Sequence, residues 1–267
     1  MPSENSWKTK REQMNRDGYC LLESVVSMDL IDGLREGSDR LLDEFSPVEQ
    51  HLVRYQGSNL SIDFQHPSFA ELVTSPALLG SLDRLGWPTP RYMSGYILSK
   101  PPGGPPLYWH QDFMNWNHPE AVLPWTTRIF LSYYLTDTTR ENGCLRVIPG
   151  THHKRIDLHE CLPPAHGEDI QAIEDLSHPV FQDHPDAVDI PVKSEDLVIA
   201  DARVLHAAWP NTTAQRRTLL LQWHSVFPFP NPPTWWKEEI PDVIPNADPN
   251  VEYERTRTPG AHLSPNP

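Results

Sequence analysis

A histidine and a carboxylate separated by one residue are the first sign of chemistry in this sequence. His110 and Asp112 stand in the segment Tyr108–Phe113, which reads YWHQDF. In an extended chain, residues i and i+2 point to the same side, so both side chains can face one point. One imidazole and one carboxylate, completed by a second histidine, form the facial triad that holds ferrous iron and leaves positions open for oxygen. A hydrogen-bonded pair at the surface is the alternative that this short spacing also fits.

A second histidine suited to such a triad lies far along the chain. His206 stands among small and apolar residues in the segment Val204–Trp209, VLHAAW. An imidazole buried there without a partner would cost free energy. The residue is therefore predicted to be the third metal ligand, with a core histidine bonded to a backbone carbonyl as the alternative.

Two arginines begin the next apolar segment, and strand alternation distinguishes them. Arg217 shares its predicted face with Leu219, Leu221 and Trp223, whereas Arg216 shares its face with more polar residues. The more apolar face of a strand should point into the core. Arg217 is therefore predicted to point inward, where its guanidinium could bind a dicarboxylate through two parallel hydrogen bonds. A pair of surface arginines is the alternative.

The elements that must position these residues differ between two parts of the chain. Residues 8–90 are mixed: they carry apolar residues at helical spacing in places and an ambiguous polar stretch at 46–66, whereas residues 91–227 hold short apolar runs between turn residues. This pattern predicts a mainly β fold with flanking helices, namely a jelly roll or cupin-like barrel (a double-stranded β-helix) behind N-terminal helices, in one domain over residues 1–267. The expected helices are 8–16, Ser27–Phe45 with Ser27 as its cap, and two within 67–86 divided at Pro76, and the expected strands are Tyr19–Val26, Tyr92–Leu98, Thr126–Thr136, Cys144–Ile148, Leu197–Ala200, Val204–Trp209 and Thr218–Val226.

Three segments fall outside this pattern. Residues 1–7 are expected to be a loose tail. Residues 152–190 are rich in acidic residues and histidines and show no clear strand pattern, so they are predicted to be either a lid over the site or a surface excursion at the far end of the barrel. The proline-rich residues 228–267 are predicted to be an extended tail whose first half docks on the barrel.

Composition excludes several classes of function. The balance of 22 Lys and Arg against 36 Asp and Glu gives a net charge of −14, which does not favour binding to nucleic acid or an anionic membrane. The three cysteines show no CxxC spacing, which indicates reduced thiols and a cytoplasmic protein. No apolar run is long enough for a membrane span, and no signal-peptide core is expected at the start. The oligomeric state is not indicated.

The ordered motifs together resemble the phytanoyl-CoA dioxygenase family of double-stranded β-helix oxygenases. They are WHQD at 109–112, NGCLRVIPGTHH at 142–153, and the pattern H-x4-N-x5-R from His206 to Arg217. The resemblance covers roughly residues 10–227, most of the chain. It implies that His110, Asp112 and His206 bind iron(II) and that Arg217 binds the distal carboxylate of the cosubstrate 2-oxoglutarate. It also implies that O2 is consumed and that succinate and CO2 are released.

One position departs from that family. Relatives often carry a serine two residues after the distal histidine, where it helps to hold oxoglutarate, and this chain has Ala208 there. Another group is expected to supply the hydrogen bond. The candidates are Ser94, Tyr96, Ser99 and Thr126.

Aromatic residues crowd the metal motif. Tyr108, Phe113 and Trp116 are predicted to line the substrate pocket, and Trp116 matches a pocket tryptophan in the ectoine hydroxylase branch that this stretch resembles. Packing within the barrel core is the alternative for the same residues. His166 is expected at the surface, and Asp201 is expected to cap a turn or to orient a histidine.

The resemblance implies an enzyme that oxidises, most simply hydroxylates, a small organic molecule. The acidic surface does not favour an acyl-CoA, whose phosphates require cations. Desaturation, epoxidation and ring formation on the same scaffold remain open, as does a cupin-like binding protein without turnover. Asp112 argues against a halogenase, because in such an enzyme the carboxylate position must be vacant for chloride.

Overall fold

The computed structural model describes residues 4–44, 58–61, 66–114, 116, 118–163 and 165–226. The predicted docking of the tail 228–267 therefore lies outside the described residues. Within these ranges, none of the helices combines the length and the apolar character that crossing a membrane requires.

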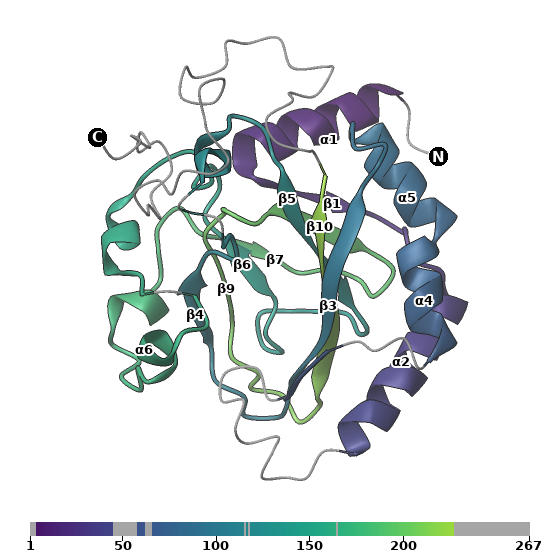
Figure 1. Ribbon diagram of the computed structural model, residues 1–267. Coiled ribbons are helices and arrows are strands. Elements are labelled where there is room, and N and C mark those ends of the chain that lie inside the picture. Colours follow the sequence, from purple (N-terminus) through teal and green to yellow (C-terminus); the bar gives the residue numbers. More distant parts are fainter. Residues whose placement is uncertain are drawn as a thin grey trace.

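Two antiparallel sheets face each other and form a jelly-roll core (Figure 1). The larger sheet has six strands in the order β1-β8-β5-β10-β3-β2, and the smaller has four in the order β4-β9-β6-β7, with no hydrogen-bonded closure into one barrel among the described strands. The space between the sheets is filled by residues of both, including Leu98, Tyr134, Val147, Val198 and Leu219. The strands are β1 (Tyr19–Leu22), β2 (Ser58–Ser61), β3 (Arg91–Lys100), β4 (Leu107–His110), β5 (Arg128–Tyr134), β6 (Leu145–Val147), β7 (Val188–Ile190), β8 (Leu197–Asp201), β9 (His206–Ala208) and β10 (Arg217–Ser225).

Among the described residues, four helices cover the outer face of the six-stranded sheet (Figure 1). They are α1 (Glu4–Asp17), α2 (Met28–Asp43), α4 (Pro67–Thr74) and α5 (Pro76–Arg84). The N-cap prediction for Ser27 is confirmed, since its side chain accepts a hydrogen bond from the backbone N–H of Leu30. The predicted break at Pro76 is also confirmed, because Ser75 ends one helix and caps the next.

The structure corrects several expected boundaries. The expectation of a loose tail over residues 1–7 is wrong for residues 4–7, because α1 begins at Glu4 and buries Trp7 in the core. Gly18 follows this helix in the left-handed region at φ +80, which favours glycine. The strand expected to continue to Val26 ends at Leu22, and β7 is a strand inside the segment that showed no strand pattern.

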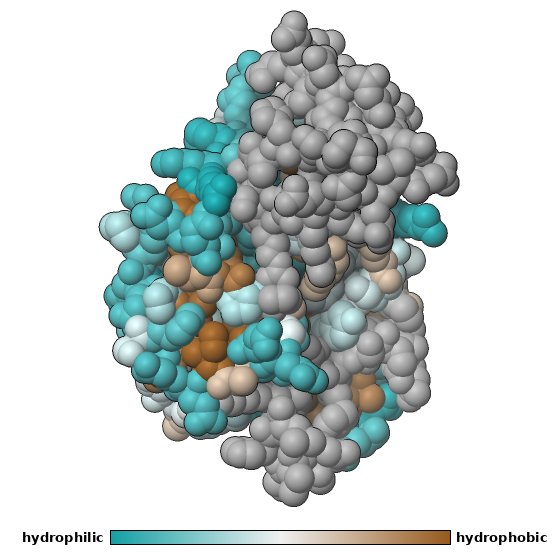
Figure 2. Space-filling model, turned by 60° about the vertical axis from the view of Figure 1, so that its left-hand side comes forward, coloured by the Kyte–Doolittle hydropathy of each residue, from teal (hydrophilic) through white to brown (hydrophobic). Residues whose placement is uncertain are grey.

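Most of the long segment 152–190 packs against the four-stranded sheet. It contains the short helices η2 (Asp157–Cys161), α6 (Glu168–Gln171) and η3 (Pro179–Phe181), whereas η1 (Pro119–Val122) precedes the segment. Ile170 and Val180 are fully buried against Leu107 and Tyr108 of β4. Figure 2, which brings this side of the molecule forward, shows a mostly hydrophilic surface interrupted by apolar patches.

Candidate active site

The two strands β4 and β9 bring the predicted metal ligands together. His110 lies directly opposite His206 in the antiparallel register, and their ring centroids are 4.1 Å apart. Asp112 follows β4, with its Oδ1 3.5 Å from Nε2 of His110 and its Oδ2 3.6 Å from Nε2 of His206. One potential ligand atom from each residue lies within 4.8 Å of the other two, and all three residues are buried. The arrangement is the facial triad that the spacing predicted.

Backbone carbonyls orient both imidazoles. Nδ1 of His110 lies 2.9 Å from the carbonyl oxygen of Tyr108, and Nδ1 of His206 lies 3.1 Å from that of Val204. A carbonyl oxygen only accepts hydrogen bonds, so Nδ1 carries the proton in each ring. Nε2 is then left as the metal-binding nitrogen, and the hydrogen bond fixes the direction of its lone pair.

Burial sets the charge of the triad. Burial, with a further effect of His206, lowers the pKa of His110 to about 4, so this ring is neutral at neutral pH. Burial alone would raise the pKa of Asp112, but His206 and the contacts with His110 and His166 hold it well below its ordinary value. A neutral imidazole and an ionised carboxylate are the states that bind a divalent metal, so the donor set fits iron(II).

Arg217 is a buried cation with free hydrogen-bonding capacity. Its exposed fraction is 1%, and within the described part of the chain its Nε and Nη1 have no hydrogen-bond partner. Its guanidinium carbon lies 5.6 Å from the centre of the Tyr134 ring. A buried guanidinium with two unused donors fits one carboxylate of a dicarboxylic acid.

Alternation along β10 is as predicted. Arg217 lines the same cavity as Leu219, Leu221 and Trp223. Arg216 points away from it and donates from Nη1 to the hydroxyl of Ser99 at 2.5 Å.

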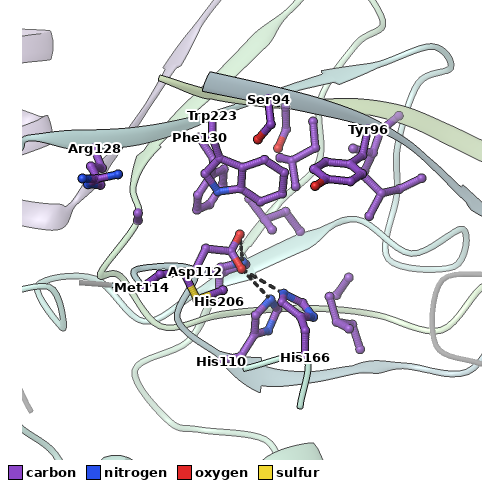
Figure 3. Close-up of a pocket in the computed structure, with 18 of the residues that line it drawn as sticks. Ser94, Tyr96, His110, Asp112, Met114, Arg128, Phe130, His166, His206 and Trp223 are labelled. Atoms are coloured by element: carbon purple, nitrogen blue, oxygen red, sulfur yellow. Dashed lines mark hydrogen bonds and ion pairs between the residues drawn. The ribbon is translucent and has the colours of Figure 1, made fainter. Parts of the chain in front are cut away.

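A single large cavity connects the triad to Arg217. Its volume is about 880 Å³. Figure 3 shows Ser94, Tyr96, Phe130 and Trp223 across this cavity from the triad. Arg128 lies at one edge of the view and pairs with Glu120 at 3.1 Å.

The structure separates the other predicted site residues into two groups. Ser94, Tyr96 and Tyr108 line the cavity. The remaining four are buried but do not line it: Ser99, Thr126, Phe113 and Trp116. Ser99 is the partner of Arg216, and the rings of Phe113 and Trp116 pack edge to face at 5.0 Å.

His166 is a site residue that the sequence analysis did not find. The expectation that it lies at the surface is only partly right, because its side chain is 42% exposed but its Nε2 lies 3.0 Å from Oδ1 of Asp112. No local pattern could have indicated this contact, which joins residues 54 positions apart.

Asp201 caps a turn, one of its two expected roles, because its Oδ1 accepts a hydrogen bond from the backbone N–H of Arg203 at 2.8 Å. It forms an ion pair with Arg203 at 2.8 Å, and both side chains are only 1% exposed. The pair braces the turn before β9 and so supports His206.

A jelly roll with a buried His-Asp-His triad and an inward arginine defines the class of non-haem iron oxygenases that use a 2-oxo acid. The comparisons with known proteins identify the family. The model of the phytanoyl-CoA dioxygenase family matches residues 14–219, and the chain belongs to this family. It is an iron(II)- and 2-oxoglutarate-dependent dioxygenase, as the motifs implied.

Two curated relatives are similar over most of their length. An ectoine dioxygenase of Nocardia farcinica is 25% identical, with 79% of this chain and 76% of the relative aligned. An L-proline trans-4-hydroxylase of Streptomyces griseoviridis is 27% identical, with 77% and 81% aligned.

Solved structures share the fold. EctD from S. alaskensis, crystallised with 2-oxoglutarate and 5-hydroxyectoine, superposes with a TM-score of 0.58 at 23% identity and covers 82% of this chain and 75% of that one. The epimerase SnoN, in complex with Fe³⁺, alpha-ketoglutarate and nogalamycin RO, gives a TM-score of 0.62 at 18% identity and covers 88% and 93%.

Proposed function

We propose that this protein hydroxylates a small organic molecule in the cavity between the triad and the aromatic side chains of Phe130 and Trp223. The observation that carries the proposal is that the triad lines one cavity together with Arg217, whose Nε and Nη1 lack a hydrogen-bond partner among the described residues. Iron, 2-oxoglutarate and O2 supply the oxidising chemistry when bound, with succinate and CO2 as the other products.

The chain's own residues bind and orient the reactants. His110, Asp112 and His206 would hold the iron, and a donor set of three residues would leave coordination positions open to the reactants. Arg217 binds the distal carboxylate of oxoglutarate. Tyr96 and Ser94 are the cavity-lining candidates for the hydrogen bond that Ala208 cannot supply.

The substrate side of the cavity is largely apolar. Met93, Phe130 and Trp223 line it together with Tyr108, while Arg128 offers a cation already paired with Glu120. We infer a substrate with an apolar ring or chain and a polar or anionic group. Phe113 and Trp116 do not line the cavity but cluster with Ala202, which does. The names of the relatives point to ectoine and proline as first compounds to test.

We further propose that the protein acts in the cytoplasm on a free small molecule. The three cysteines are unpaired, which suits a reducing compartment.

The test of this function measures iron, succinate and product together. We expect one Fe(II) per chain and succinate release that rises when a substrate is added. Asp112→Ala is expected to lose iron and turnover, whereas Asp32→Ala, which changes an exposed residue of α2, should keep both. Full turnover by Asp112→Ala after chelation would contradict the assignment.

The mass of the product separates hydroxylation from desaturation and ring formation, and the chemical structure of the product separates hydroxylation from epoxidation. Hydroxylation adds one oxygen atom, whereas desaturation or ring formation removes two hydrogens. A binding protein without turnover would release no succinate with any compound of the panel.

A further inference from the structure

His166 reaches the metal site from the segment that packs on the outside of the four-stranded sheet. Its Nε2 lies 3.0 Å from Oδ1 of Asp112, and its ring packs edge to face on that of His110 with centroids 4.8 Å apart. Figure 3 shows His166 beside His110, with both rings directed at the carboxylate.

The hydrogen bonds of His166 define its tautomer. The Asp112 carboxylate accepts, so Nε2 of His166 carries the proton and donates it to Oδ1. Nδ1 of the neutral ring then accepts from the hydroxyl of Tyr108 at 3.1 Å. The chain from Tyr108 through His166 to Asp112 is therefore consistently directed: Tyr108 donates, His166 accepts at Nδ1 and donates at Nε2, and the Asp112 carboxylate accepts.

The backbone of His166 is held in an unusual conformation. Its φ is +57, a region that residues other than glycine rarely adopt. The side chain of Gln171 donates to the carbonyl oxygen of His166 at 2.8 Å and helps to retain it. An outlier of this kind at a site is a reason to look for a function in the contact that it makes possible.

His166 is placed to support the metal ligand rather than to be one. In the described part of the chain, the ligand atoms that lie mutually within 4.8 Å come from His110, Asp112 and His206, and His166 is outside that set. A ligating carboxylate commonly receives a hydrogen bond from a neighbour, which fixes its orientation.

The same residue ties a wall of the cavity to the metal site. His166 and Gln171 both line the cavity, and Ile170 and Val180 anchor the neighbouring chain by complete burial. We name residues 165–182 the covering segment. Residues 152–190 were predicted to be either a lid over the site or a surface excursion at the far end of the barrel, and these contacts favour the lid.

We propose that His166 is a positioning residue: it orients the Asp112 carboxylate for iron and thereby couples iron binding to closure of the covering segment over the cavity. Coupling of this kind is reciprocal, so iron should stabilise the segment as much as the segment strengthens iron binding. The inference rests on the proposed function only in requiring iron at the triad.

The test uses the full-length protein with anaerobic Fe(II) as the probe. His166→Leu is expected to weaken Fe(II) binding roughly tenfold or more, the size usual for partners of metal ligands. His166→Gln can place an amide N–H near the position of Nε2 and should recover most of the affinity. Tyr108→Phe should cause a smaller loss in the same direction. His184→Gln, in the same long segment, is the matched control and should bind like the wild type.

Amide hydrogen exchange measures the coupling between Fe(II) binding and closure of the covering segment without requiring turnover. Fe(II) should slow exchange of residues 165–182 in the wild type and in His184→Gln, but not in His166→Leu. Wild-type Fe(II) affinity in His166→Leu would overturn the proposal, as would equal losses in the Leu and Gln variants or exchange that ignores Fe(II). Absence of Fe(II) binding by the wild type would instead contradict the proposed function.

Discussion

The buried guanidinium of Arg217 is suited to bind a carboxylate before any ligand is present. Arg217 is buried beside Lys100, whose ammonium group donates to the carbonyl oxygen of Trp209 at 2.7 Å. Arg217 itself leaves Nε and Nη1 without a partner among the described residues. A buried donor without a partner costs about 1–3 kcal/mol, and more when it is charged. A bound carboxylate removes that cost, so its contribution to cosubstrate binding should be large.

We therefore predict that Arg217→Ala weakens binding of 2-oxoglutarate by about 2–3 kcal/mol, on the order of a hundredfold in the dissociation constant. Arg217→Lys should be intermediate, because it keeps the charge but loses the paired hydrogen bonds. Calorimetric titration of the Fe(II)-loaded protein measures the effect. Arg216→Ala is the control, and a larger loss for that variant would show that the phase of β10 has been assigned to the wrong residue.

The turn between β8 and β9 shows how elements position the site. Arg203 pairs with Asp201 and donates to the carbonyl oxygens of Ala121, Leu123 and Trp125, so one side chain ties the loop after η1 to this turn. Its own carbonyl oxygen accepts from the side chain of Gln111 at 2.5 Å. Gln111 lies between two triad residues, and the turn leads into β9 with the third. The segment that carries His110 and Asp112 and the turn that precedes His206 are therefore both held in place by Arg203.

We predict that Arg203→Met lowers the free energy of unfolding by about 3–5 kcal/mol, because it leaves the buried Asp201 carboxylate uncompensated. Urea denaturation followed by tryptophan fluorescence measures the change. Adding Asp201→Asn to the Arg203→Met variant removes the uncompensated charge and should recover part of the lost free energy of unfolding. The exposed pair of Arg155 and Glu160 provides the control, since Arg155→Met should stay within about 1 kcal/mol of the wild type. Equal effects of the two arginine variants would contradict this account.

At the scale of the whole molecule, buried histidines link stability to pH. Burial lowers the pKa of His224 to about 4, and its ring is only 2% exposed beside Tyr92. In the unfolded chain the ordinary pKa is about 6.5. Between these values the unfolded state binds a proton that the folded state does not. The stabilising contribution is therefore complete above about pH 6.5, is lost as pH falls towards 4, and changes no further below that.

We predict that His224→Phe makes the acid loss of stability shallower in the metal-free protein. The ring contact with Tyr92 is kept, and the buried Nδ1 that lacks a partner in the described structure is removed. The difference between variant and wild type should grow by up to about 3 kcal/mol between pH 7 and pH 4. Urea unfolding at several pH values tests this prediction. If the free energies of unfolding of the variant and the wild type change in parallel over this pH window, His224 does not cause the pH dependence.

Local spacing in the sequence determined much of this site by itself. The one-residue gap between His110 and Asp112 and the alternation that turns Arg217 inward are properties of an extended chain, so consecutive residues suffice to predict them. The cap at Ser27 is equally local. The tertiary structure decided the contacts between distant segments. His166 contacts Asp112, the rings of Phe113 and Trp116 pack on each other without lining the cavity, and β7 pairs with β6. Such contacts depend on how whole elements pack against one another, and the local periodicity of the sequence does not determine that packing.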